Sequence, residues 1–392
     1  MRSDSAQPLR FAMAGLIGMA AAMGIGRFVF TPILPGMMDG LGLDASEAGL
    51  IASANYLGYL LGAIIAAGGW AHGRERPVML AGLGANAVLL GLMAVADGLA
   101  AFLAIRFLAG LASAFLMIFL SAIVFSRLAA AGRNGLQALH FGGVGFGICV
   151  SALITGGLFA SGHGWRAPWL IASLVATVAF LAVLPLARGG PLFAAGAGRE
   201  PPLPKSPALR RIILAYGLFG AGYIVTATFL VAIVRQEGSG PVSEAMVWLV
   251  TGLAGIPSVW LWGKLARRWS LTAAFAAGCL VEAAGIAASV GLPSPLGPLL
   301  GGALLGGTFI AVTALGLQAG RQLASLAPRR ALALMTAAFG IGQILGPIGA
   351  GYLADWTGSF VAPSLAAALI LLASSLIGWS AGRDSAEARG ER

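Results

Sequence analysis

Two arginines lie inside long apolar stretches of the sequence, where a charged side chain needs an explanation. Arg27 belongs to the stretch 10–34 and Arg106 to the stretch 100–125. If these stretches cross a membrane, a charge at the bilayer centre costs about 2.5–3.5 kcal/mol. At about 1.5 Å per helical residue, both guanidinium groups lie at a similar depth. Together they could clamp a carboxylate through paired hydrogen bonds, so both are candidate substrate-binding residues.

The alternative for each arginine is a structural role. A long cationic side chain can extend toward the membrane surface and pair there, with Asp39 or Asp97 as its partner. The prolines that follow Arg27 favour substrate contact for this residue, because proline bends a helix and can open it beside a cavity.

Neutral polar side chains in other apolar stretches complete the candidate substrate-binding set. Asn55 and Tyr59 are four residues apart, so on a helix they share a face and both can hydrogen-bond a polar ligand. A structural hydrogen bond to a neighbouring helix is the alternative. Tyr223 and Gln343 are the candidates in the second half of the chain.

Two further ionisable residues are candidates for carrying a proton. His140 begins an apolar, Gly-rich stretch, and an unperturbed histidine titrates at about pH 6.5. Glu282 is the only carboxylate deep within an apolar stretch, where burial disfavours the charged form. The alternatives are a hydrogen bond from His140 to a backbone carbonyl and a packing role for Glu282.

The composition of the chain predicts the surroundings of these residues. Hydrophobic residues make up 58% of the 392 residues and charged residues only 10%, against about 25% charged in soluble domains. A water-soluble fold cannot bury that much apolar surface. Glycine contributes 59 residues, and small residues allow close helix contacts in a bilayer. The sequence therefore predicts an all-α integral membrane protein.

Twelve stretches are long enough for a span, which needs about 20 apolar residues. The predicted spans are 10–34, 46–70, 77–96, 100–125, 135–161, 165–187, 210–235, 243–264, 270–291, 296–320, 331–354 and 358–381. Lys and Arg in short loops remain cytoplasmic. With the N-terminus inside, 20 of the 24 cations fall in cytoplasmic segments. We therefore expect both termini in the cytosol.

The spans divide into two groups of six. The longest predicted cytoplasmic loop, Arg188 to Pro207, is rich in Pro and Gly. It gives an N-terminal bundle over 1–187, a linker over 188–208 and a C-terminal bundle over 209–392. Short matches recur at an offset of about 194 residues, such as Gly69 to Arg74 against Gly263 to Arg268. Repeats of this kind, with a substrate site at their interface, are found in secondary transporters.

Several motifs resemble those of the major facilitator superfamily of transporters. GWAHGRER from Gly69 and GKLARR from Gly263 resemble the basic loops after the second and eighth spans, and RFLAG from Arg106 resembles a motif of the fourth span. Within the superfamily, GIGRFVFTPILP from Gly24 and ASANYLGYLLGA from Ala52 are similar to the YbfB/YjiJ-type branch. The resemblance implies twelve helices in two six-helix repeats, and secondary active transport by alternating access.

The resemblance also implies an inner gate bordered by the two basic loops. The corresponding residues of this chain are Gly69, Arg74, Arg76, Gly263, Arg267 and Arg268. The usual acidic residue is absent from both loops, because Gly73 and Arg267 occupy its place. The loops therefore depart from the family pattern at that position.

The charges in the spans favour one class of substrate. Transporters of this fold that export cationic drugs place a carboxylate in the first, fourth or fifth span, and none is present here. Two arginines and a histidine instead give the N-terminal half a positive lining suited to a small anion. We therefore expect a proton-coupled symporter or antiporter of a small organic anion, such as a carboxylate. The alternative is an efflux carrier for apolar drugs or metabolites, in which both arginines serve structure only.

Other classes of protein fit the sequence poorly. An enzyme would need a catalytic or metal-binding motif, and His72, His140 and His163 form none, so we expect no cofactor and no metal. The net charge of +10 comes with no basic segment interleaved with aromatics, which excludes nucleic acid as a partner. Two six-span repeats also fit a channel or a receptor poorly. We expect a monomer in the cytoplasmic (inner) membrane, with the substrate, protons and lipid as its partners.

Overall fold

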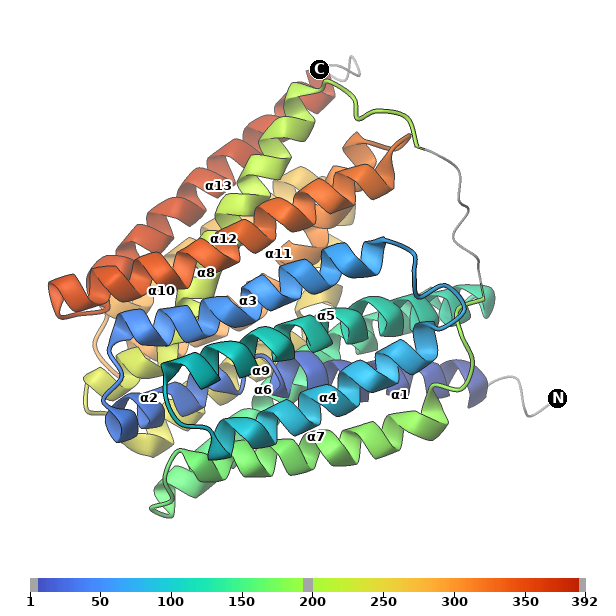
Figure 1. The fold of residues 1–392 in the computed structure, drawn as a ribbon. Coiled ribbons are helices and arrows are strands. Elements are labelled where there is room, and N and C mark those ends of the chain that lie inside the picture. Colours follow the sequence, from blue (N-terminus) through green and yellow to red (C-terminus); the bar gives the residue numbers. More distant parts are fainter. Residues whose placement is uncertain (1–5, 193–199, 388–392) are drawn as a thin grey trace.

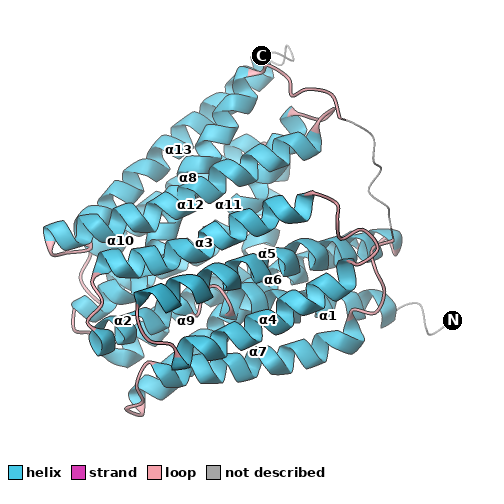
Figure 2. Cartoon of the chain, in the orientation of Figure 1, coloured by secondary structure: helices cyan, strands magenta, loops and turns pink. Residues whose placement is uncertain are grey.

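The computed structural model describes residues 6–192 and 200–387, and all of its regular elements are helices (Figure 2). The first half of the chain forms α1 Ala6–Met19, the π-helix η1 Ala20–Ile25, α2 Phe30–Leu41, α3 Ala45–Ala67, α4 Glu75–Val95, α5 Leu99–Ala130, the 3-10 helix η2 Asn134–Leu136, α6 Gln137–Ala160 and α7 Arg166–Leu186. The second half forms α8 Pro207–Gln236, α9 Gly240–Arg268, α10 Leu271–Gly291, α11 Leu296–Leu323, α12 Pro328–Thr357 and α13 Val361–Glu387.

Within these residues, twelve helical stretches are long and apolar enough to cross a bilayer, and each coincides with one predicted span. The first is Gln7–Leu41, which joins α1, η1 and α2. Several spans are longer than predicted, such as Gly240–Arg268 against 243–264, because a helix can continue past the apolar core of the bilayer into the headgroup region. The prediction of a twelve-span, all-α membrane protein is confirmed.

The two groups of helices have the same order and similar spacing. We call α1–α7 the N half and α8–α13 the C half. The helices α3, α4, α5 and α7 begin about 195 residues before α9, α10, α11 and α13, respectively. Figure 1 shows the start of α1 and the end of α13 at the same end of the bundle, here called the termini end. The opposite end, where α2 meets α3, is called the closed end.

The first span is broken in its middle. Gly26 N–H donates to the carbonyl of Ala21 at 2.8 Å and Phe28 N–H to that of Met23 at 3.2 Å, which is the wider hydrogen bonding of a π-helix. A proline ring clashes with the carbonyl four residues earlier, which for Pro32 is that of Phe28. The disruption therefore falls on residues 20–29, upstream of both prolines.

Ionic contacts join the two halves at the closed end. Arg235 of α8 pairs with Glu244 of its own half and with Asp39 of α2 at 2.5 Å. The carboxylate of Asp355 in α12 accepts the backbone N–H groups of Ala45 and Ser46, at 2.9 and 2.8 Å, at the first turn of α3. Since a helix N-terminus carries partial positive charge, this carboxylate is well placed to stabilise the contact.

The start of α3 is also stabilised within its own half. Asp44 accepts hydrogen bonds from Glu47 N–H and from the Ser46 hydroxyl, both at 2.7 Å, and Glu47 accepts one from Asp44 N–H at 3.3 Å. The bond from Glu47 N–H, followed by that from Ser46, lowers the pKa of Asp44 below its ordinary value of 3.8. The cap therefore stabilises the start of α3 fully at pH values above 3.8, and it loses this effect only as the pH falls through the lowered pKa of Asp44.

Close backbone approaches lie beside these ionic contacts. A Cβ at Gly49 of α3 would overlap the carbonyl of Pro347 in α12, and one at Gly351 would overlap the carbonyl of Ala45. The two halves therefore meet backbone to backbone in the closed end, where only glycine leaves enough room.

At the termini end, the described part of the linker contacts α12. Glu200 accepts the backbone N–H groups of Arg329 and Arg330, both at 3.1 Å, and Arg329 Nε at 2.9 Å. Residues 193–199 of the expected linker lie outside the described residues. The same is true of four cations used to predict the orientation, namely Arg2, Arg199, Arg389 and Arg392.

Candidate functional site

Arg27 lies in the turn between η1 and α2, with a side chain that is only 4% exposed. Its Nε and Nη2 have no hydrogen-bond partner among the described residues. The guanidinium carbon lies 4.6 Å from the ring centre of Tyr56, 4.8 Å from that of Tyr59 and 5.7 Å from that of Phe28. Ring faces attract a cation, but they accept no strong hydrogen bond, so two donors remain available to a ligand.

Arg106 of α5 is buried beside Arg27 but has a different environment. Its Nη1 donates to the carbonyl of Gly26 at 3.2 Å and its Nη2 to that of Arg27 at 3.1 Å. Both carbonyls belong to the broken part of the first span, where regular helical partners are missing. Arg106 therefore holds the backbone that carries Arg27.

Neither arginine pairs with the carboxylate expected for a structural role at the membrane surface. Asp39 pairs with Arg235, and Asp97 pairs with Arg166 at 2.6 Å. The predicted pairing with Asp39 or Asp97 is therefore wrong, because each of these carboxylates pairs with another arginine at the closed end.

Asn55 and Tyr59 of α3 both hydrogen-bond α5, and Tyr59 also contacts Arg27. Asn55 Nδ2 donates to the backbone carbonyl of Arg106 at 3.0 Å, and its Oδ1 has no partner among the described residues. The Tyr59 hydroxyl donates to the sulfur of Met117 at 2.7 Å, while the Tyr59 ring lies against Arg27. Asn55 thus supports the backbone of α5, and Tyr59 contributes to the surroundings of Arg27 with its ring.

Tyr56, which is absent from the predicted site, is a residue of α3 that contacts both Arg27 and the other half. Its ring covers Arg27, and its hydroxyl lies 3.4 Å from Thr228 Oγ1 of α8. Its spacing from Tyr59 could have identified it from the sequence, because residues three apart on a helix share a face.

Tyr223 and Gln343 of the C half are brought together by the structure. Gln343 Nε2 donates to the Tyr223 hydroxyl, and Gln343 Oε1 has no partner among the described residues. The Tyr223 ring lies 5.0 Å from Phe219, 5.7 Å from Phe339 and 5.9 Å from Phe309, with interplanar angles of 17°, 13° and 13°. We call these four rings the aromatic wall.

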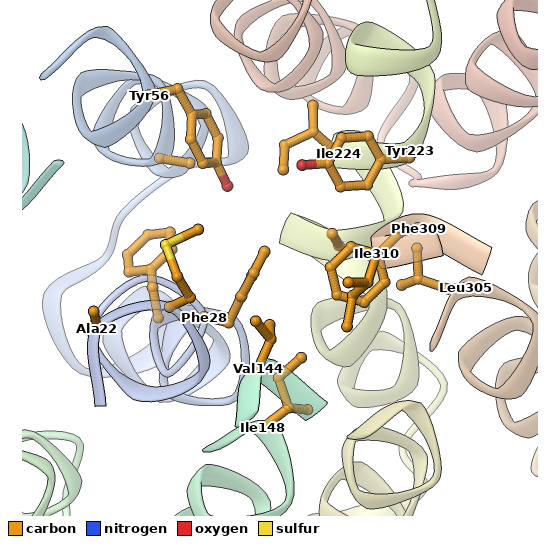
Figure 3. Close-up of a cluster of buried hydrophobic side chains, with 14 of the residues drawn as sticks. Ala22, Phe28, Tyr56, Val144, Ile148, Tyr223, Ile224, Leu305, Phe309 and Ile310 are labelled. Atoms are coloured by element: carbon orange, nitrogen blue, oxygen red, sulfur yellow. The ribbon is translucent and has the colours of Figure 1, made fainter. Parts of the chain in front are cut away.

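The site lies where the two halves face each other. Figure 3 shows the Tyr56 and Tyr223 hydroxyls directed toward the same space from opposite sides. Phe28 contacts Phe309 edge to face at 5.6 Å, which links the residue after Arg27 to the aromatic wall. These phenylalanines could not be selected from the sequence, because aromatic residues in spans most often serve packing.

His140 lies apart from this site. It packs on Gly15 of α1, twelve residues before Arg27 in the chain, or about 18 Å along a helix. Its Nε2 lies 2.9 Å from the Ser121 hydroxyl, and its Nδ1 has no partner among the described residues. The ring is fully buried against Phe125 at 4.9 Å. The alternative hydrogen bond to a backbone carbonyl is replaced here by one with a hydroxyl.

Glu282 of α10 is fully buried inside the C half, and neither carboxyl oxygen has a hydrogen-bond partner among the described residues. Thr308 lies beside it, but its hydroxyl donates to the Leu304 carbonyl at 2.6 Å. The next residue is Phe309 of the aromatic wall. Glu282 therefore lies against α11, the helix that bears Phe309.

The residues expected to border an inner gate lie at the termini end, but only one set forms a loop. Gly69 adopts a φ of 74° in the turn between α3 and α4. Arg74 is exposed, and Arg76 donates to the carbonyls of Ala187 at 2.7 Å and Leu184 at 3.0 Å. The second set, Gly263, Arg267 and Arg268, was expected in a loop. This expectation is wrong, because α9 remains helical to Arg268.

The family comparison matches nearly the whole chain. A family model described as "Uncharacterised MFS-type transporter YbfB" matches residues 19–378. A chloramphenicol resistance protein of Streptomyces lividans is 28% identical over 377 residues, which cover 91% of this chain and 92% of that protein.

Two solved structures have the same fold. A mutant form of the nucleoside transporter NupG matches with a TM-score of 0.75 and 14% identity, over 95% of this chain and 99% of that chain. A bacterial homolog of the human lysosomal transporter Spinster, in an inward-facing and occupied conformation, matches with a TM-score of 0.74 and 14% identity, over 97% of each chain. At this level of identity the likeness concerns the fold.

Proposed function

The chain belongs to the YbfB-type family of major facilitator transporters, and on that premise we propose that it carries a small organic anion, such as a carboxylate, by alternating access. The observation that carries this proposal is the buried guanidinium of Arg27, whose Nε and Nη2 meet no acceptor among the described residues. A buried charge without a partner is costly. A carboxylate would neutralise it and accept two hydrogen bonds from one planar fork.

The placement of acidic residues supports an anion over a cation as the substrate. The described carboxylates of the N half all stand near helix ends: Asp39, Asp44, Glu47, Glu75 and Asp97. A cationic substrate would find no counter-ion beside Arg27. The positive charge of Arg27 and Arg106 would instead raise the local concentration of anions.

We further propose that 1–187 and 209–392 move as two bundles, joined by the linker 188–208. In this proposal the protein lies in the inner membrane with both termini in the cytosol. The closed end then faces outward, and the conformation is inward-facing. The Asp39–Arg235 pair and the Asp355 contacts would hold the outer mouth shut and break when it opens. Arg74, Arg76, Arg267 and Arg268, together with Gly69 and Gly263, would border the inner gate of a monomeric carrier.

Replacing Arg27 tests the anion site. Arg27→Gln is expected to lower carboxylate affinity by about tenfold to a hundredfold, since hydrogen bonds to a charged group contribute about 1.5–3 kcal/mol. The carboxylate affinity of Arg27→Lys should lie between those of the wild type and Arg27→Gln, because lysine keeps the charge but not the planar fork. The measurement is uptake of radiolabelled acetate, succinate and benzoate into proteoliposomes.

The matched control is Arg166→Gln, which removes an arginine that is partly exposed and paired with Asp97 at the closed end. It should transport at the wild-type rate. If Arg27→Gln accumulates every carboxylate as fast as the wild type, Arg27 does not bind the substrate and the anion proposal is wrong.

Proton coupling is assigned to Glu282 in this proposal, with His140 as the second candidate. Glu282 is supported by its complete burial and by two carboxyl oxygens without a hydrogen-bond partner among the described residues, next to the helix that bears Phe309. A carboxyl group in such surroundings has no fixed partner that would prevent it from exchanging a proton. His140 shares a hydrogen bond with Ser121, so one of its ring nitrogens already has a partner.

Glu282→Gln is expected to abolish the effect of a pH gradient on substrate accumulation while leaving substrate exchange intact, because an amide cannot bind or release the proton. Accumulation driven by an imposed pH gradient should fall to the level without a gradient, and counterflow should persist. Unchanged gradient-driven accumulation in Glu282→Gln, with loss in His140→Asn, would transfer the role to His140.

Efflux of an apolar drug or metabolite is the second candidate function. Two observations favour it: three aromatic rings already cover the Arg27 guanidinium, and the 28% identical relative is a chloramphenicol resistance protein. In this case Arg27 would serve structure only. Broad drug hypersensitivity of a deletion strain, without a growth defect on any organic anion, would favour efflux over anion transport.

A further inference from the structure

The surroundings of Arg27 are aromatic on both sides of the site. In the N half, Tyr56 and Tyr59 lie against the guanidinium, and Phe28 follows it in the chain. Phe28 meets Phe309 of the C half at 5.6 Å. A ligand whose carboxylate reaches Arg27 therefore meets ring faces and edges along the rest of its length.

The aromatic wall presents nearly parallel rings. Tyr223 makes angles of only 13° with both Phe309 and Phe339 and of 17° with Phe219, at centroid distances of 5.0–5.9 Å. Aromatic pairs favour offset stacking at separations of about 4.5–7 Å. A flat ring can add to such an arrangement, whereas a saturated ring of similar size makes apolar contact only.

The two halves also present unpaired polar groups of opposite kind. Arg27 offers donors, at Nε and Nη2, and Gln343 offers an acceptor, at Oε1. The other end of the Gln343 amide is used by Tyr223, which fixes the amide beside the aromatic wall. Both residues are at least nine-tenths buried. A ligand that satisfies both groups needs an anionic acceptor at one end and a donor at the other.

We propose that the transported anion is an aromatic carboxylate with a hydroxyl or amino group distant from the carboxylate. The carboxylate pairs with Arg27, the ring stacks on Phe309 and Tyr223, and the distal donor binds Gln343 Oε1. The inference rests on the proposed function of organic-anion transport and adds the ring and the donor to it.

Binding of four probes to the purified full-length protein tests this inference. The probes are para-hydroxybenzoate, benzoate, cyclohexanecarboxylate and the neutral para-hydroxybenzamide, compared by equilibrium dialysis. We expect para-hydroxybenzoate to bind about threefold to tenfold more tightly than benzoate, because its hydroxyl adds one hydrogen bond. Benzoate should bind about twofold to tenfold more tightly than cyclohexanecarboxylate, because its flat ring adds one stacked aromatic pair.

Two variants assign these preferences to residues. Gln343→Leu should reduce the affinity for para-hydroxybenzoate to that for benzoate, and Phe309→Leu should remove the preference for benzoate over cyclohexanecarboxylate. The control is Phe229→Leu, which removes a buried ring of α8 that contacts Phe360 at 5.0 Å, outside the aromatic wall. If Phe309→Leu fails to fold, the comparison of probes on the wild-type protein decides the question alone.

The outcomes separate this inference from the function on which it rests. Equal affinities for benzoate and cyclohexanecarboxylate, both lost in Arg27→Gln, overturn the aromatic assignment and leave the anion carrier intact. Equal affinities for para-hydroxybenzoate and benzoate overturn the role of Gln343. Binding of para-hydroxybenzamide as tight as that of para-hydroxybenzoate, unchanged in Arg27→Gln, overturns the proposed function itself.

Discussion

Gly49→Leu is expected to abolish transport by trapping the carrier with its closed end open. In the structure, a Cβ at Gly49 overlaps the Pro347 carbonyl of the other half, and a backbone atom within a helix cannot move aside. Overpacking of this kind costs about 1–3 kcal/mol, occasionally more, which shifts a two-state equilibrium by about fivefold to 150-fold. When the two halves separate at this end, the leucine has room, so the variant should fold.

A reporter cysteine measures this shift. Thr31 lies at the same interface, is 3% exposed and donates to the Ala227 carbonyl of the other half. In a background in which Cys149 and Cys279 are replaced by serine, Thr31→Cys should react with a membrane-impermeant maleimide only when Gly49→Leu is also present. The reagent is applied to whole cells and to inverted vesicles, so that the reactive side also reports the orientation.

Gly349→Leu is the matched control for this variant. Gly349 lies two residues after Pro347 on the same helix, is exposed, and an added Cβ there meets no atom within 4 Å. It should transport normally and leave Thr31→Cys unreactive. An unreactive Thr31→Cys in the Gly49→Leu variant, together with normal transport, would show that α3 and α12 need not approach so closely during the cycle.

The fold could be predicted because each span carries its own signal. Twelve apolar stretches fixed the number of helices, and their positions agree with the structure. The prolines predicted a bend in the first span, but the pattern could not place the break at residues 20–29, because its position depends on hydrogen bonding along the backbone and on the ring of Pro32 acting on the turn before it. Likewise, a Gly-led basic segment predicts a turn, but the segment from Gly263 continues α9, since a single glycine is tolerated within a helix and Lys264, Leu265 and Ala266 after it favour one.

The residues of the site were predictable only in part, because a sequence gives the type of a side chain but not its direction. Arg27 and Arg106 were selected for the same reason, the cost of a charge in a span. The structure separates them: Arg106 donates to two backbone carbonyls, and Arg27 donates through Nε and Nη2 to none among the described residues. That difference depends on which helix faces which, and hence on packing between α5 and the first span.

The division of work between the arginines has a physical basis. A π-helix followed by a turn leaves carbonyls without their regular partners, and in a bilayer water cannot satisfy them. Arg106 supplies two donors to this segment from a single rigid group, while Asn55 supplies one to the backbone of α5 itself. Because these contacts hold the backbone of Arg27, its guanidinium faces the rings of α3 with Nε and Nη2 free to bind a ligand.

Arg106→Leu is therefore expected to destabilise the protein and to abolish substrate binding together. The carbonyls of Gly26 and Arg27 lose their donors, and an unsatisfied buried group costs about 1–3 kcal/mol each. We expect a free energy of unfolding lower by about 2–6 kcal/mol, with Arg106→Lys restoring part of it because an ammonium can replace one donor. The measurements are unfolding followed by circular dichroism and carboxylate binding on the same samples.

Arg166→Leu provides the comparison, since Arg166 likewise bonds one carbonyl, that of Ala94 at 2.8 Å, and one further acceptor, Asp97. Its side chain is 45% exposed, so water can replace both bonds and the loss should stay below about 1 kcal/mol. Equal losses in the two variants would mean that the broken span does not depend on Arg106. Normal stability of Arg106→Leu with binding lost would instead make Arg106 a direct ligand of the anion, beside Arg27.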